Sequence, residues 1–342
     1  MNDADLLLSM RPFAREDRRA SWLYVLSTVA LLAAVTAGAA FLRPWPLRLL
    51  ASTIEGLLLV RTFILFHDFQ HGAILRTSRV AQAFFWLYGM SVLTPPRVWR
   101  QTHNYHHANN AKIVGSHVGS YPVVTLPMWK AMQPAQRLAY RIARHPVTIA
   151  LGYFTVFGWG MCASPFIRAP RKNATGLGAL VLQIALAVVV SHWLGVDTWL
   201  FAVFMPLVIA TASGSYLFYA QHNFEGIQLR ARENWSYVGA ALGSTSYMAM
   251  GRVGQFFTGN IGFHHVHHMN PGIPFYRLEE AMSQVVELQS PVELRLRWAD
   301  VVATFRGQVW DAEANAMITI AQANRSEVVA HAITRSEPRT TP

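Results

Sequence analysis

Four long apolar segments constrain most strongly what this chain can fold into. Residues 22–42, 174–194 and 198–218 contain no Asp, Glu, Lys or Arg. A fourth segment, 48–66, includes charged residues but is apolar overall. Each segment is about twenty residues long, which is enough for a helix to cross roughly 30 Å of hydrocarbon. The pattern therefore predicts four membrane-spanning helices.

The low content of charged residues supports the same interpretation. Charged residues make up 14% of the chain and hydrophobic residues 52%, whereas soluble domains contain about 25% charged residues. The net charge of +11 comes from Lys and Arg residues that flank the apolar segments, which is typical of membrane proteins and argues against a nucleic-acid groove. The single cysteine, Cys162, excludes an intramolecular disulfide and a thiolate metal cluster.

The distribution of basic residues predicts how the segments cross the membrane. Arginines cluster just before the first segment, which predicts a cytoplasmic N-terminus. The segment begins after about twenty residues and no small-residue cleavage site is evident, so we expect a retained anchor and not a cleaved signal peptide. We expect an all-α integral membrane protein with one domain, 1–342, whose four spans form two hairpins. A histidine-rich helical cap on the cytoplasmic side is then built from 67–173 and 219–310, and residues 325–342 form a disordered tail.

Three other segments require separate interpretations. Residues 80–93 are apolar but too short to span, and they suit an interfacial helix. Residues 146–166 are long enough, but glycines and prolines interrupt them and basic residues flank both ends, so we expect both ends on the cytoplasmic side. Residues 291–305 are expected to form an amphipathic cytoplasmic helix.

Three short histidine clusters lie between and after the apolar segments: HDFQH at 67–71, HNYHH at 103–107 and HHVHH at 264–268. Because residues i, i+3 and i+4 share one face of a helix, each cluster can direct two or three imidazoles to a common point. Structural histidines give no reason for such grouping, so the pattern predicts metal binding. Eight of the fourteen histidines stand at these spacings, namely His67, His71, His103, His106, His107, His264, His267 and His268.

The number and type of these side chains limit which metals they bind. One zinc ion in a protein takes about four ligands, so eight imidazoles imply at least two ions. Neutral imidazole suits zinc, copper, iron and nickel, and ligand type alone leaves these open. The carboxylate-rich pattern of soluble di-iron bundles is missing. The segment 67–71 lacks the glutamate of HExxH metalloproteases, which disfavours a hydrolase.

Three residues close to the clusters have predicted roles as well. His222 follows the fourth segment at the depth where His67 follows the second, which predicts a ninth ligand; the alternative is a histidine that caps the helix end. His265 is one step, about 100°, around the helix from His264, so we expect it to point away from the metals. We place His265 and Glu225 outside the ligand set, with Glu225 orienting an imidazole.

The third cluster and its flanks resemble those of the membrane fatty acid desaturases. The most specific part is TGNIGF at 258–263, followed by HHVHH and by NPGIPFY at 270–276. The resemblance covers about residues 55–280, with the clusters in the same order relative to the spans. It implies a non-haem centre of two iron ions that uses dioxygen and two external electrons to remove two hydrogens from an acyl chain. It also implies a further metal-binding histidine at the point of the chain where His222 stands.

Details of the clusters indicate a subtype within that family. The HxxxH spacing of the first cluster resembles the enzymes that act on lipid-linked acyl chains more than the acyl-CoA type. His264 in place of glutamine argues against the front-end desaturases. No fused haem domain is visible, so the resemblance implies a separate electron donor of the ferredoxin or cytochrome type. We expect the active site on the cytoplasmic side of an integral membrane protein that acts on membrane lipid.

Two alternatives stay open at this point. A lipid or alkane hydroxylase or a carotenoid ketolase has the same histidine clusters and shares the initial hydrogen abstraction, so the spacing does not separate it from a desaturase. A metal transporter or membrane metal sensor needs ionisable residues along a path through the membrane. Glu55 and Asp197 supply few of them.

Overall fold

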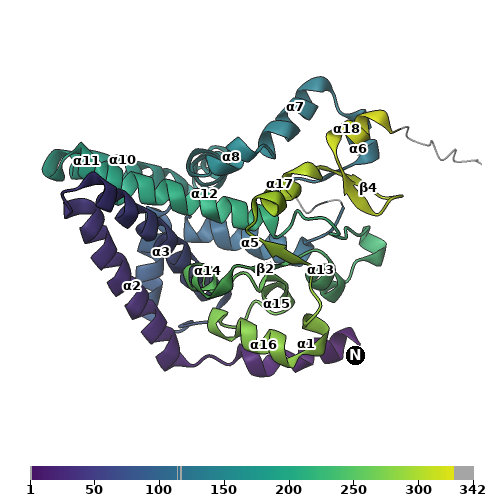
Figure 1. The fold of residues 1–342 in the computed structure, drawn as a ribbon, viewed down its shortest axis with the longest axis horizontal. Coiled ribbons are helices and arrows are strands. Elements are labelled where there is room, and N and C mark those ends of the chain that lie inside the picture. Colours follow the sequence, from purple (N-terminus) through teal and green to yellow (C-terminus); the bar gives the residue numbers. More distant parts are fainter. Residues whose placement is uncertain (1, 114, 116–117, 327–342) are drawn as a thin grey trace, which may run out of the picture.

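The computed structural model of the chain describes residues 2–113, 115 and 118–326. The tail predicted to be disordered, 325–342, lies outside the described residues from 327 onward. The described chain is mostly helical. Figure 1 shows long helices gathered on one side of the molecule and shorter elements on the other.

Four helical segments are long and apolar enough to cross a membrane. The predicted spans are therefore confirmed, whereas their arrangement as two membrane hairpins below a cytoplasmic cap stays a prediction. The fourth segment is composite and includes a π-helical stretch, η3. The segments are α2 (Arg18–Phe41), α3 (Trp45–His71), α10 (Ala174–Leu194), and α11 (Val196–Trp199) with η3 (Leu200–Phe204) and α12 (Met205–Ala220).

Helix α3 is the centre of this bundle. In its most apolar window 61% of the residues are buried, against 11% in α10, the least buried of the four spans. Helices α2 and α12 both pack against α3. A Cβ added at Gly56 would lie 2.7 Å from the Ile209 side chain, so glycine permits the close approach of α3 and α12.

Polar side chains of α3 have partners inside the bundle, which offsets the cost of burying them. Thr36 Oγ1 of α2 donates a hydrogen bond to Glu55 at 2.6 Å. At the start of α3, Arg48 pairs with Asp197 at the start of the fourth span. The second and fourth spans therefore begin at the same depth and run in the same direction.

The two helices after α3 bring the histidines of segment 103–107 back to the C-terminal end of α3. Helix α4 (Arg79–Ser91) forms where an interfacial helix was expected, and its Phe85 and Tyr88 rings contact Phe66 of α3. Helix α5 (Pro96–Asn109) starts at a proline, which suits a first turn because the missing N–H has no intrahelical partner there.

The glycine-interrupted segment 146–166 is helical but broken into three pieces. They are α8 (Pro146–Ala150), the π-helical η2 (Tyr153–Ala163) and α9 (Ser164–Arg168). η2 packs against α10 and α12. The course of this segment relative to the membrane stays a prediction.

The remaining helices are short and lie mostly among the elements drawn on the side away from the spans (Figure 1). The α-helices are α1 (Asp3–Ser9), α6 (Leu126–Ala131), α7 (Pro134–Ala143), α13 (Tyr237–Gly243), α14 (Gly251–Phe257), α15 (His264–Met269), α16 (Leu278–Gln284), α17 (Trp298–Arg306) and α18 (Ile320–Arg325). The 3₁₀ turns are η1 (Arg11–Ala14), η4 (Arg232–Asn234), η5 (Phe275–Arg277) and η6 (Val286–Leu288).

Short strands tie parts of the cap together. β1 (Val124–Thr125), β4 (Val309–Asp311) and β5 (Ala316–Ile318) form one sheet, and β2 (Tyr247–Ala249) pairs in parallel with β3 (Glu293–Arg295). The prediction of a helix over 291–305 is therefore wrong for the first half of this segment. The backbone there completes the hydrogen bonds of β2, and the helix begins only at Trp298.

Candidate metal centre

The last turn of α3 holds the first histidine pair. His67 and His71 lie one turn apart, just before Gly72 ends the helix in a left-handed conformation with φ 74°. His67 Nε2 lies 3.1 Å from Nε2 of His103 on α5. Two helices that are far apart in the sequence thus direct imidazoles at one point.

The histidines gather into two groups, which we call the first and the second cluster. The ligand atoms of the first cluster all lie within 4.8 Å of one another, and so do those of three members of the second. His264 joins the second cluster because its Nε2 lies 2.9 Å from Nε2 of His222. The first cluster is His67, His71, His103, His107 and His267, and the second is His106, His222, His264 and His268.

His222 lies just past the end of α12 and has partners at both ring nitrogens. Its Nε2 is 3.1 Å from Nε2 of His106, and its Nδ1 is 3.2 Å from the carbonyl oxygen of Ser244. An Nδ1–H group that donates to this carbonyl leaves the Nε2 lone pair directed into the second cluster. In the described structure both partners lie outside α12, which differs from the arrangement of a helix cap.

The spacing of the nitrogens fits metal coordination. Two imidazole nitrogens that each lie about 2.1 Å from one ion and at a right angle are about 3.0 Å apart. Five Nε2–Nε2 distances within the clusters are 2.9 to 3.1 Å. Nε2 of His71 and of His268 is buried without a hydrogen-bond partner among the described residues, as a nitrogen reserved for a metal would be.

Burial keeps these imidazoles neutral. It lowers the pKa of His103, His106 and His107 on α5 well below the ordinary histidine value, and the neighbouring imidazoles lower it further. Burial lowers the pKa of His222 to about 4. A neutral imidazole offers the lone pair that a metal ion needs, so the clusters are ready to bind metal at neutral pH.

Two supporting residues were missed from the sequence. Asp68 Oδ1 lies 3.1 Å from His67 Nδ1, and its Oδ2 accepts a hydrogen bond from the Phe275 backbone N–H at 2.7 Å. Trp99 stacks on His103 with ring centroids 4.2 Å apart. The available signal was position, since Asp68 follows His67 directly and Trp99 stands one helical turn before His103.

The two residues predicted outside the ligand set lie away from the clusters. His265 is buried on the other side of α15, where its Nε2 is 3.1 Å from the Leu288 carbonyl oxygen. Glu225 is exposed, and no hydrogen bond or ion pair connects it to a histidine in the described part of the chain. The role predicted for Glu225 in orienting an imidazole is therefore not supported, because the chain turns outward after the buried Phe224.

A narrow apolar cavity lies between α3, α4, η2 and α12. Its volume is about 30 Å³, and its walls include Phe63, Tyr88, Phe157 and Gly214. Phe63 precedes His67 by one helical turn, and its ring centroid lies 6.0 Å from that of Trp99. One wall of the cavity therefore lies next to the side chains around the histidines.

Comparison with known proteins identifies the family. The fatty acid desaturase family model matches residues 43–298, which include all nine clustered histidines. The chain belongs to the fatty acid desaturase family. The resemblance inferred from the histidine segment 264–268 and its flanks is confirmed. The protein is an oxidoreductase with histidine clusters able to bind metal.

The chain is similar to several proteins named as fatty acid or acyl-lipid desaturases. It is 30% identical over 269 residues to a fatty acid desaturase of Bacillus subtilis, covering 78% of this chain and 75% of that protein. It is 24% identical over 282 residues to the sn-1 oleoyl-lipid 12-desaturase of Synechocystis, covering 79% and 77%. It is 25% identical over 273 residues to the chloroplastic sn-2 acyl-lipid omega-3 desaturase (ferredoxin) of Arabidopsis thaliana, covering 75% of this chain and 59% of that protein.

Proposed function

We propose that the protein introduces a double bond into a lipid-linked fatty acyl chain, using dioxygen and a non-haem centre of two iron ions. The observation that carries this proposal is the arrangement of nine imidazoles in two clusters at the ends of the apolar spans α3 and α12. The names of relatives that act on acyl lipids point to the same substrate class.

Each part of the site has a role in this reaction. The first and second clusters would hold one iron ion each, and iron so bound supplies the redox chemistry that activates dioxygen. Asp68 holds the His67 ring in place through Nδ1, and Ser244 does the same for His222. Apolar side chains between the spans, such as Phe63 one helical turn before His67, exclude water beside the clusters and would contact an acyl chain there.

The electrons come from a separate donor protein on the cytoplasmic side. The ferredoxin in the name of the plant relative supports a soluble iron–sulfur donor, although a cytochrome would serve the same chemistry. The cytoplasmic location follows from the arginines before α2, which place the N-terminus and the end of α3 on that side.

The proposed topology requires that residues 146–166 do not make a net crossing. The second and fourth spans run in the same direction, because Arg48 pairs with Asp197 at one end and their following histidines meet at the other. Helix α10 precedes the fourth span and therefore starts on the histidine side. The chain leaves His107 and returns to Ala174 on the same side.

Cysteine labelling tests this topology. In a Cys162→Ser background, His145→Cys and Pro170→Cys variants should react with a membrane-impermeant maleimide from the same side. Both positions are exposed, so accessibility depends on the side of the membrane alone. Labelling from opposite sides would mean that the segment crosses and would contradict the topology.

The function is tested by expression in a host whose lipids lack polyunsaturated chains, followed by mass spectrometry of intact lipids. We expect a loss of two mass units from acyl chains that are still esterified to lipid. A His107→Ala variant is the inactive control and should leave these chains unchanged. Products that gain oxygen would indicate a hydroxylase instead, and double bonds confined to acyl-CoA would contradict the lipid-linked substrate.

A further inference from the structure

A long part of the chain carries positive charge only. Between residues 69 and 196 there are nine Arg and three Lys residues but no Asp or Glu. Neutralising carboxylates must therefore come from other segments or from a ligand. The positive-inside rule accounts for basic residues next to spans, but it does not require a basic pocket.

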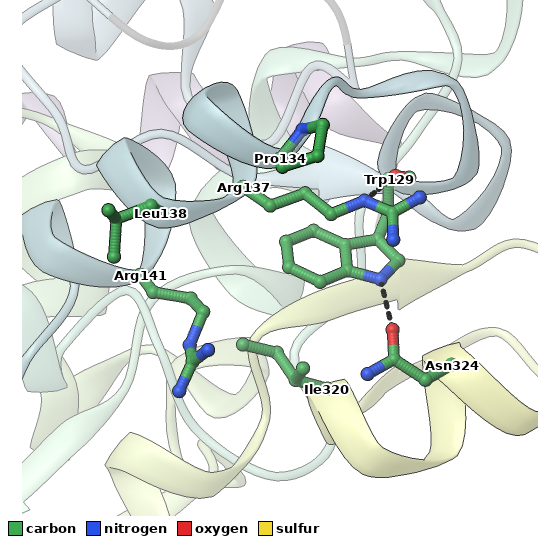
Figure 2. A pocket seen from close by; sticks show the side chains of 7 residues that line it. All are labelled: Trp129, Pro134, Arg137, Leu138, Arg141, Ile320 and Asn324. Atoms are coloured by element: carbon green, nitrogen blue, oxygen red, sulfur yellow. Dashed lines mark hydrogen bonds between the residues drawn. The ribbon is translucent and has the colours of Figure 1, made fainter.

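Such a pocket lies between α6, α7 and α18. It has a volume of about 280 Å³, and Trp129, Arg137, Arg141 and Ile320 are among its walls (Figure 2). No acidic residue is found among the described residues that line it. Figure 2 shows Arg137 beside the indole of Trp129 and the Arg141 side chain extending away from that indole, on the side of Ile320.

Arg137 is held in a fixed orientation. Its Nε donates to the Trp129 carbonyl at 3.1 Å and its Nη2 donates to the Lys130 carbonyl at 2.9 Å, while the guanidinium lies 5.2 Å from the Trp129 ring centroid. These bonds leave Nη1 for a ligand. Arg141 is exposed and has no hydrogen-bond or ion-pair partner within the described residues. Two guanidinium groups that line one pocket give it a positive charge suited to an anionic headgroup.

An exposed apolar stripe leads from the spans to this pocket. Leu138 and Ile142 of α7, Val147 of α8, Leu151 and Phe154 are each between 46% and 57% exposed. The stripe ends at η2, which packs against the spans α10 and α12. Exposed apolar side chains in this continuous arrangement are typical of a surface that contacts lipid tails.

We propose that this surface binds an anionic glycerophospholipid, with its headgroup in the pocket lined by Arg137 and Arg141 and its acyl chains along the stripe. The two parts match the two ends of such a lipid, because arginines line the pocket and the exposed side chains that follow toward η2 are apolar. An acidic protein would match the arginines but not the apolar side chains beside them. The proposal does not depend on the reaction at the histidines.

Lipid binding to the full-length protein in detergent tests this proposal, with native mass spectrometry as the readout. Phosphatidylglycerol should bind more tightly than phosphatidylcholine with the same acyl chains. Arg141→Gln should weaken phosphatidylglycerol binding about tenfold, which is the loss of one charge-assisted contact. Arg141→Lys keeps the charge and should recover part of the affinity.

The matched control is Arg171→Gln, which removes an exposed arginine before α10 that does not line the pocket. It should leave phosphatidylglycerol binding unchanged. Equal binding by Arg141→Gln and wild type, or equal weakening by Arg171→Gln, would overturn the proposal. Displacement of the lipid by inorganic phosphate at similar concentrations would assign the pocket to a soluble phosphate instead.

Discussion

The two histidine clusters are built in different ways. In the first cluster four of the five imidazoles come in i, i+4 pairs, one at the end of α3 and one on α5. In the second cluster only His264 and His268 form such a pair, and His106 and His222 each come alone from separate elements. Helix geometry specifies most of the first cluster, whereas tertiary contacts specify half of the second.

The two clusters also differ in the groups that hold their histidine rings in place. A carboxylate, Asp68, lies next to a ring nitrogen of the first cluster. In the second cluster the corresponding partner of His222 is a backbone carbonyl, and the next residue, Asn223, accepts a hydrogen bond from Arg144 Nη2 at 2.6 Å. Changes far from the histidines should therefore affect the second cluster more than the first.

The largest expected effects come from neighbouring ligands that face different clusters. His107→Ala and His106→Ala should each lower turnover by more than about 100-fold, since removal of a ligand costs more than removal of its outer partner. Metal analysis should show that each variant loses mainly one of two ions. His265→Ala is the control and should retain both ions. Equal metal loss in all three variants would contradict the assignment of two clusters.

Asp68→Asn should have the next largest effect. The amide cannot stabilise the His67 ring as a carboxylate does, so metal affinity of the first cluster should fall by about 10- to 100-fold. Titration of the apoprotein with ferrous iron measures this change. Glu225→Gln alters an exposed carboxylate and should have no effect. A similar loss of iron affinity in both variants would mean that the removed negative charge, and not the contact of Asp68 with His67, is responsible.

Arg144→Gln should have a smaller effect, confined to the second cluster. The Arg144 side chain is fully buried and donates to Pro122, Tyr219, Asn223 and Gly307. Its loss leaves buried acceptors unsatisfied and should reduce stability by about 1–3 kcal/mol, seen as a lower Tm in detergent. Weakened iron binding at the first cluster rather than the second would contradict the difference between the clusters.

Much of the fold and most of the cluster residues followed from local patterns. Charge-free runs of about twenty residues are visible in the sequence because a helix must match the membrane thickness. The i, i+4 spacing of His67 with His71 and of His103 with His107 is equally local. These features need no knowledge of which segments meet in space.

Features that depend on distant contacts were missed. The contact of Asp68 with the Phe275 backbone joins residues 207 positions apart, and no local pattern reports it. The strand at 293–295 exists because β2 offers it a partner, so amphipathic periodicity alone predicted a helix. The outward turn after Phe224 that exposes Glu225 depends in the same way on the packing of the cap.

The metal content of the purified protein tests the central claim most directly. Nine imidazoles in two clusters predict about two iron ions per chain in the wild type. Removal of His222, which belongs to the second cluster alone, predicts about one ion per chain in His222→Ala. A His222→Ala protein that keeps both ions with normal turnover, or a wild type that holds a single ion, would contradict the account.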